Sequence, residues 1–145
     1  MTAYADRIRT LREKSGKSTE EMCDLLGMSD MGYFDLELHD SELPTVLSLD
    51  QIRRLATALS VTVSALISED GLAVPARRIE YRELVEHTKD HLRKAGRTQK
   101  QFEDEIGWDL NDFFESEQKT IDSYNLEFVK ALCGALGILW LEAVP

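Results

Sequence analysis

The sequence predicts an all-α fold made of two tandem five-helix units. Apolar residues recur at helical spacing along most of the chain, and no segment keeps the strict alternation that is typical of a strand. The chain also repeats itself at a distance of eighty residues, because setting Gly16 on Gly96 gives an unbroken register that ends with Glu37 on Glu117. The 145 residues therefore divide into two small domains. Domains of this size bury more surface if they pack against each other.

The centre of the first unit is the stretch of residues 18–37, which predicts two short helices joined by a tight turn. Ser18 and Glu21 form a capping-box pattern that begins the first of these helices. Gly27 can take the left-handed conformation that the turn needs, and Ser29 can cap the second helix. The expected helices of this unit cover residues 3–14, 18–26, 30–38, 49–59 and 63–67, with a loop at 39–45.

The second unit repeats this plan after a linker, which is indicated by Gly71 and Pro75. The expected boundaries are a first domain at 1–70, a linker at 71–76 and a second domain at 77–145. In the second domain, helices are expected over 78–94, from 98 to a turn at 107, over 110–116 and from 125 onward. The loop between 116 and 125 is three residues shorter than its counterpart in the first domain.

The charge balance is strongly acidic. Lys and Arg total 17 against 27 Asp and Glu, so the formal net charge is -10. A charge of this sign opposes nonspecific attraction to nucleic acid or anionic lipid, and it attracts a basic partner.

Patterns typical of several other protein classes do not occur. Cys23 and Cys133 lie in apolar helical patterns without a partner at metal-ligand spacing, which is typical of reduced core thiols in the cytoplasm. The N-terminus has no signal-peptide pattern, and no stretch reaches the roughly eighteen apolar residues of a membrane span. There is no nucleophile motif and no glycine-rich phosphate loop. We therefore expect a cytoplasmic, non-enzymatic protein that uses neither a cofactor nor a metal.

A family resemblance rests on the order and spacing of residues between 8 and 66. The residues that carry it are Leu11, Arg12, Gly16, 18–23 (STEEMC), 26–29 (LGMS), Glu37 and 55–61 (LATALSV). They resemble the phage-repressor-like (lambda repressor/Cro-type, XRE) helix-turn-helix family, and the second unit resembles it more weakly. The matching residues of the second unit are Gly96, Thr98, Gln99, Ile106, Gly107 and 131–138.

The resemblance implies that the third helix of each unit enters the major groove of DNA. It also implies a buried ion pair between an arginine of the first helix and the glutamate that ends the third helix. This pair maps onto Arg12 with Glu37 and, one residue out of register, onto Arg93 with Glu117. Each pair would tie two helices together, because a buried charge without a partner is costly.

The expected DNA-reading surface carries the wrong charge for DNA. No Lys or Arg occurs between Lys17 and Arg53. The acids in that interval are Glu20, Glu21, Asp24, Asp30, Asp35, Glu37, Asp40, Glu42 and Asp50. Asp30 and Asp35 stand where the family contacts bases and phosphates. Carboxylates there repel DNA, because binding depends on neutralising phosphates.

The second unit is acidic in the same region, and both units add an aromatic residue. Phe34 and Phe114 occupy matching positions beside acids, where the family pattern points outward. An exposed aromatic ring among charges is typical of a protein-binding hot spot. The predicted partner-binding residues are Asp30, Phe34, Asp35, Asp109, Asp112, Phe114 and Glu115. Two other interpretations stay open: the acids form an ordinary solvated face, and the rings pack between the units or lie on a rotated third helix.

Two smaller patterns have alternative explanations. Glu83, His87 and His91 recur at four-residue steps and could hold a metal, but an ordinary solvated helix face explains them as well. Trp140 and Leu141 make the C-terminal segment more apolar than a short terminal helix needs. We expect this segment to pack across the two units or to form a homodimer contact.

The sequence leaves two functions to compare. We expect a non-catalytic acidic interaction module that binds a basic protein, in an inhibitor, antitoxin or immunity-type role, with DNA disfavoured at the third helix. The alternative is a DNA-binding transcription regulator with non-standard contacts. The cations available for such contacts are Arg7, Arg9, Lys14, Lys17, Arg77, Arg78 and Arg82.

Overall fold

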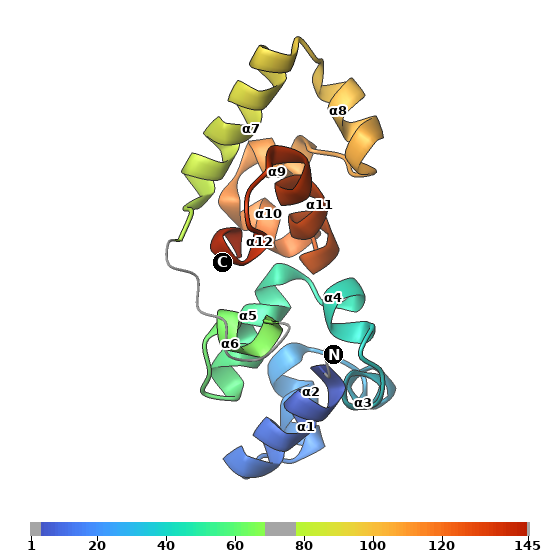
Figure 1. Ribbon diagram of the computed structural model, residues 1–145. Coiled ribbons are helices and arrows are strands. Elements are labelled where there is room, and N and C mark those ends of the chain that lie inside the picture. Colours follow the sequence, from blue (N-terminus) through green and yellow to red (C-terminus); the bar gives the residue numbers. More distant parts are fainter. Residues whose placement is uncertain (1–3, 69–77, 145) are drawn as a thin grey trace.

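The computed structural model describes residues 4–68 and 78–144, called here the first half and the second half, and its regular elements are all helices (Figure 1). The all-α prediction is confirmed for these residues. The predicted linker at 71–76 lies outside the described residues. None of the described helices is long and apolar enough to cross a membrane.

Six helices make up the first half. They are α1 Tyr4–Ser15, α2 Thr19–Leu26, α3 Asp30–Leu38, α4 Glu42–Val46, α5 Leu49–Ala58 and α6 Val63–Ile67. The predicted caps are present, because the Ser18 side chain accepts a hydrogen bond from Glu21 N and the Ser29 side chain accepts one from Gly32 N. Gly27 ends α2 with a φ of 64°, in the left-handed region.

The core of the first half lies between α1, α2, α3 and α5. Ile8, Met22, Tyr33 and Leu55, one from each of these helices, are completely buried. α1 packs along α3, and α2 packs on α5. The inner faces of α2 and α3 are therefore used for the core, and their outer faces are turned to solvent.

Six helices also make up the second half. They are α7 Tyr81–Ala95, α8 Gln99–Ile106, α9 Asn111–Glu115, α10 Glu117–Ser123, α11 Leu126–Leu136 and α12 Trp140–Ala143. The prediction of five helices in each unit is wrong, because both expected loops contain a helix, α4 and α10. Leu43, Leu47 and Ile121 of these segments are buried. Tertiary burial thus orders segments whose turn residues alone predict loops.

The two halves differ in how their first helices pack. In the first half α1 lies along α3. In the second half α7 and α8 form a splayed hairpin at one end of the molecule (Figure 1). α7 meets α9 near its own N-terminus, where the Tyr81 hydroxyl donates to Phe113 O at 2.6 Å. α7 also packs on α11.

The halves meet at matching positions of the repeat. Ser48 and Asn125 are the N-caps of α5 and α11, and they pair with each other in an antiparallel bridge. Leu49 N donates to Tyr124 O at 2.9 Å, and the Asn125 side chain donates to Thr45 O at 3.0 Å. α5 packs on α10 while α11 packs on α4. This reciprocal exchange of matching helices has the pattern of an isologous interface, here within one chain.

One hydrophobic core runs through this junction. Leu47 and Leu49 of the first half and Leu126 and Phe128 of the second half belong to a single cluster of buried residues. Small domains bury too little apolar surface to be very stable alone. The shared core therefore stabilises both halves at once.

Candidate partner-binding surface

The outer face of α3 carries an exposed row of apolar side chains. Met31, Phe34 and Leu38 are 71%, 57% and 53% exposed, and their spacing of three and four residues places them on one side of the helix. Tyr33 and Leu36 on the opposite side are completely buried. We call the row formed by Met31, Phe34 and Leu38 the α3 stripe. A contiguous exposed apolar row of this kind is typical of an interaction surface.

An ion pair fixes which side of α3 faces outward. The Arg12 guanidinium of α1 binds the Glu37 carboxylate through Nε and Nη2, and these two side chains are only 14% and 11% exposed. The Tyr33 hydroxyl also donates to Glu37 Oε1, at 2.9 Å. The hydrogen bond that Arg12 donates to Glu37 raises the pKa of Arg12. Burial, and then the hydrogen bond to Glu37, raise the pKa of Tyr33. The Arg12 and Glu37 pair implied by the family resemblance is thus present, and it locks α3 onto α1.

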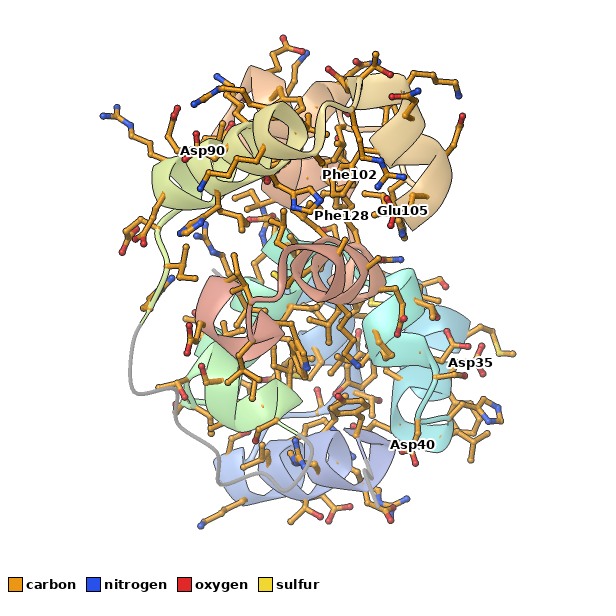
Figure 2. All side chains as sticks on the ribbon, turned by 45° about the horizontal axis from the view of Figure 1, so that its top comes forward. Asp35, Asp40, Asp90, Phe102, Glu105 and Phe128 are labelled. Carbon is orange, nitrogen blue, oxygen red and sulfur yellow. The ribbon has the colours of Figure 1, made fainter. Side chains whose placement is uncertain are left out.

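Carboxylates flank the α3 stripe on both sides. At about 100° per residue, Asp30 lies roughly 70° to one side of the stripe and Asp35 lies roughly 70° to the other. Neither carboxylate forms an ion pair within the described residues, and Figure 2 shows Asp35 at the outer surface. Asp30 lies in the first turn, where the helix dipole favours an acid, but Asp35 lies in the last turn, where the dipole disfavours one. Helix stability therefore does not account for Asp35.

A hollow beside the stripe separates α2 from α3. Its lining residues are Thr19, Cys23, Asp30, Met31, Phe34 and Glu37. Burial and the nearby Asp30 raise the pKa of the Cys23 thiol. A thiol of raised pKa is less often in the nucleophilic thiolate form at neutral pH.

Several other acids of the interval between Lys17 and Arg53 have structural roles. Asp40 accepts a hydrogen bond from Ala5 N at 2.9 Å, and Asp50 pairs with Arg54 at 3.0 Å. Glu20 and Glu21 lie in the first turn of α2, and Glu42 lies in the first turn of α4. A negative charge there interacts favourably with the positive end of the helix dipole. These acids still add negative charge around the α3 stripe.

The second half does not repeat this surface. α9 has five residues, against nine in α3. Phe114 is half-buried, with its ring centroid 5.3 Å from that of Phe113, whereas its counterpart Phe34 is exposed. Asp109 accepts from Asn111 N at 2.7 Å, and Glu115 pairs with Lys119 at 2.7 Å. The predicted residues of the second half, including the half-buried Asp112, are therefore not gathered around an exposed apolar row.

The predicted ion pair of the second half is absent from the described residues. Arg93 is 71% exposed and pairs with Asp90 at 2.8 Å, while Glu117 lies 3.9 Å from Arg53 across the junction. The shift of register that assigned Arg93 to this role is wrong. The buried positions of α7 follow the unshifted repeat, in which Leu92 takes the place of Arg12.

Some acids of the second half are paired with neighbouring cations. Lys100 pairs with Asp104 at 2.8 Å, and Arg97 pairs with Glu105, which Figure 2 shows on α8. α2 and α3 have no basic residue of their own, and Arg12 of α1, which binds Glu37, is the cation paired with an acid of α3. The α3 stripe therefore lies in an acidic stretch, residues 18–52, that has no Lys or Arg of its own.

The other sequence patterns contribute little to a site. Among the described residues, no group of three or more His, Cys, Asp or Glu side chains could hold a metal ion. His87 lies 3.8 Å from Glu83, and His91 packs on Phe102 with ring centroids 5.3 Å apart.

The C-terminal segment is largely folded back onto its own half. Val144 is buried, and Lys130 of α11 lies 4.8 Å from the centre of the Trp140 ring. Ile79 N donates to Glu142 O at 2.7 Å. Leu139 is 55% exposed, so it is the residue of this segment best placed for an outside contact.

Met31 and Leu38 were not predicted from the sequence as partner-binding residues. Their spacing from Phe34 could have identified them, because these three apolar residues lie opposite Tyr33 and Leu36 and are not needed on the core side of the helix.

Comparisons of this chain with protein-family models, with curated proteins and with solved structures found no match.

Proposed function

We propose that this chain is a non-catalytic interaction module that binds a basic protein partner through the α3 stripe and its flanking carboxylates. Its scaffold is proposed to be two tandem repressor-like helix-turn-helix domains, of which the first retains an exposed third helix. The role that suits such a module is that of an inhibitor, antitoxin or immunity-type protein in the cytoplasm, which covers a basic functional surface of its partner. Two reduced, buried cysteines agree with that compartment.

One observation carries the proposal. The α3 stripe is exposed between Asp30 and Asp35, in a stretch of chain without any Lys or Arg from residue 18 to residue 52. Apolar anchors supply affinity in protein interfaces, and charge complementarity supplies association rate and specificity. This surface contains apolar anchors and charged groups. The anchors fit an apolar centre on the partner, and the carboxylates attract cations around it.

DNA is a poor ligand for the same surface. A helix that enters the major groove brings its outer face against bases and phosphates. On α3 that face holds three apolar side chains and two carboxylates. Each close contact of a carboxylate with a phosphate costs about 1 kcal/mol or more, and no counterions are released to offset it.

Two of the cations proposed for non-standard DNA contacts, Arg7 and Arg9, already bind groups within the chain. Arg7 Nη1 donates to Leu66 O at 2.6 Å and to Ser68 O at 2.8 Å, and Arg9 pairs with Asp6. Lys14 and Lys17 remain on α1 and just after it, and Arg78 and Arg82 are exposed at the start of the second half, while Arg77 lies outside the described residues. A regulator that binds DNA through these cations is the competing function that the experiment below separates.

The test is capture of a partner from the native host with the intact chain as bait, followed by salt titration of the purified complex. The test variant is Asp30→Lys with Asp35→Lys. The control is Glu86→Lys with Asp104→Lys, which changes the net charge equally on the arms formed by α7 and α8. We expect a basic protein whose association slows at least tenfold with the test variant, slows with added salt, and changes little with the control.

The competing outcome is equally concrete. Binding of duplex DNA at moderate salt that is lost with Lys14→Glu and Lys17→Glu, or with Arg78→Glu and Arg82→Glu, would establish the regulator instead. A captured protein whose affinity ignores both salt and the Asp30 and Asp35 changes also contradicts the proposal.

A further inference from the structure

The spacing of the α3 stripe suits packing against another helix. Met31, Phe34 and Leu38 occupy about 10 Å of helix length at alternating steps of three and four residues. Rows with this spacing form the ridges that interdigitate when two helices pack. A partner residue can therefore enter the space between neighbouring members of the stripe.

The backbone of α3 excludes the main alternative of an extended peptide. A strand binds by adding main-chain hydrogen bonds to an open sheet edge. α3 is a helix whose own backbone groups are used internally, and no sheet is present among the described residues. A peptide that binds here gains affinity through its side chains alone, which favours a helix with its apolar residues on one face.

Charge on both sides of the stripe defines the partner more closely. Asp30 and Asp35 stand on opposite sides of the apolar row, and neither is paired with a cation in the described part of the chain. A complementary helix would carry Lys or Arg along both edges of its apolar face. One edge would be attracted to Asp30 and the other to Asp35.

Resting on the proposed function, we infer that the basic partner presents an amphipathic α-helix, with an apolar stripe bordered by cations on both sides, that packs on the α3 stripe. The site is single in each chain. In the second half, Phe114 is half-buried, α9 has five residues, and Glu115 is paired with Lys119. The repeat therefore offers one docking helix and not two.

The experiment uses two synthetic peptides of eighteen residues, composed of Leu and Lys with blocked ends. In one peptide the leucines recur at positions i, i+3, i+4 and i+7, which makes an amphipathic helix. In the other the same residues are rearranged so that the leucines are spread around the helix. Each peptide is titrated into the isotope-labelled full chain, and amide chemical shifts report the place of binding and the stoichiometry.

We expect the amphipathic peptide to bind one to one, to shift amides of α3, and to bind at least tenfold more tightly than the rearranged peptide. Met31→Ala with Phe34→Ala should weaken it at least tenfold. The control Leu139→Ala removes an equally exposed apolar side chain from the second half, and it should change the affinity less than twofold. These two variants alter only exposed side chains, so the fold remains intact.

The outcomes separate this inference from the function on which it rests. Equal, salt-sensitive binding of both peptides at α3 would overturn the helix and leave the basic partner standing. If neither peptide shifts the amides of α3, whether or not it binds elsewhere, both the helix and the basic partner at this surface are overturned. Two bound copies per chain, with α9 shifted as strongly as α3, would overturn the single site.

Discussion

The two halves follow one sequence repeat, but only the first half holds its third helix with a polar lock. Arg12, Tyr33 and Glu37 connect α1 to α3 through a guanidinium, a phenol and a carboxylate in direct contact. With that lock closed, the inner side of α3 is fixed against the core. Its outer side is consequently left for other contacts.

The second half has lost the partners of this lock while keeping its carboxylate. Leu92 and Phe113 occupy the places of Arg12 and Tyr33, so these two positions supply Glu117 with neither a cation nor a phenol. Glu117 instead lies 3.9 Å from Arg53 across the junction. The comparison teaches that the two halves join their first and third helices through different contacts, which are the ion pair of Arg12 with Glu37 in the first half and the hydrogen bond from Tyr81 to Phe113 O in the second.

The core of the second half also differs from that of the first half at one buried position of the first helix. Thr88 is completely buried at the position that matches Ile8, and its hydroxyl donates to Leu84 O at 2.9 Å within α7. A threonine there contributes less apolar contact than an isoleucine. The weaker core and the missing lock together explain why α7 and α8 are splayed.

The largest expected effect comes from opening the polar lock of the first half. Arg12→Ala leaves the Glu37 carboxylate largely buried and unpaired, and we expect the free energy of unfolding to fall by about 2–3 kcal/mol. Arg93→Ala is the matched control, because its exposed pair with Asp90 should contribute less than about 0.5 kcal/mol. Urea unfolding of both variants measures the difference. Equal losses would mean that the two halves are held in the same way.

A smaller effect is expected from exchanging the core residues. Ile8→Thr should lower the free energy of unfolding by about 2 kcal/mol, because it removes buried apolar volume and adds a hydroxyl. Thr88→Val should raise it by about 0.5 kcal/mol, because the hydroxyl only duplicates a helix hydrogen bond. Thermal unfolding monitored by circular dichroism would show the opposite signs. A loss with Thr88→Val would mean that the hydroxyl is needed in the second half.

A pH effect distinguishes the cysteines of the two halves. Burial raises the pKa of Cys133 from 9.0 to about 12. The folded state therefore keeps a proton that the unfolded chain loses above pH 9, and stability falls as pH rises through that window. From pH 8 to pH 10 the expected loss is about 1 kcal/mol, and Cys133→Ala should remove it. A profile that is unchanged by Cys133→Ala but flattened by Cys23→Ala would place the more protected thiol in the first half.

The smallest effect concerns the junction, where the halves are most alike. Ser48→Ala and Asn125→Ala each remove a helix cap, and each should cost about 1 kcal/mol or less. Asn125→Ala should cost slightly more, because it also removes the hydrogen bond to Thr45 O. Chemical unfolding measures both losses of stability. Repeating it at low and high protein concentration shows whether the two halves still pair within one chain or pair between chains.

Local chemistry made much of the fold predictable. Ser18, Gly27, Ser29 and Asn125 have short-range roles as caps or turn residues, and each occurs in the expected role. α4 and α10 were missed because their order comes from burial of residues such as Leu43 and not from local signals. The candidate surface was predictable in part, since Asp30, Phe34 and Asp35 flank or form the α3 stripe.

The sequence by itself determined the helical periodicity, the caps and the excess of acids, because each of these depends on neighbours within about four residues or on composition. The repeat was also visible in the sequence, because it follows from aligning the chain with itself. Only the tertiary structure decided that the α3 stripe is exposed while Phe114 is half-buried, and that Arg93 turns away from Glu117. Those outcomes depend on which side chains meet between helices that are far apart in the sequence. Packing of that kind is a property of the whole core, and identical spacing along the chain does not specify it.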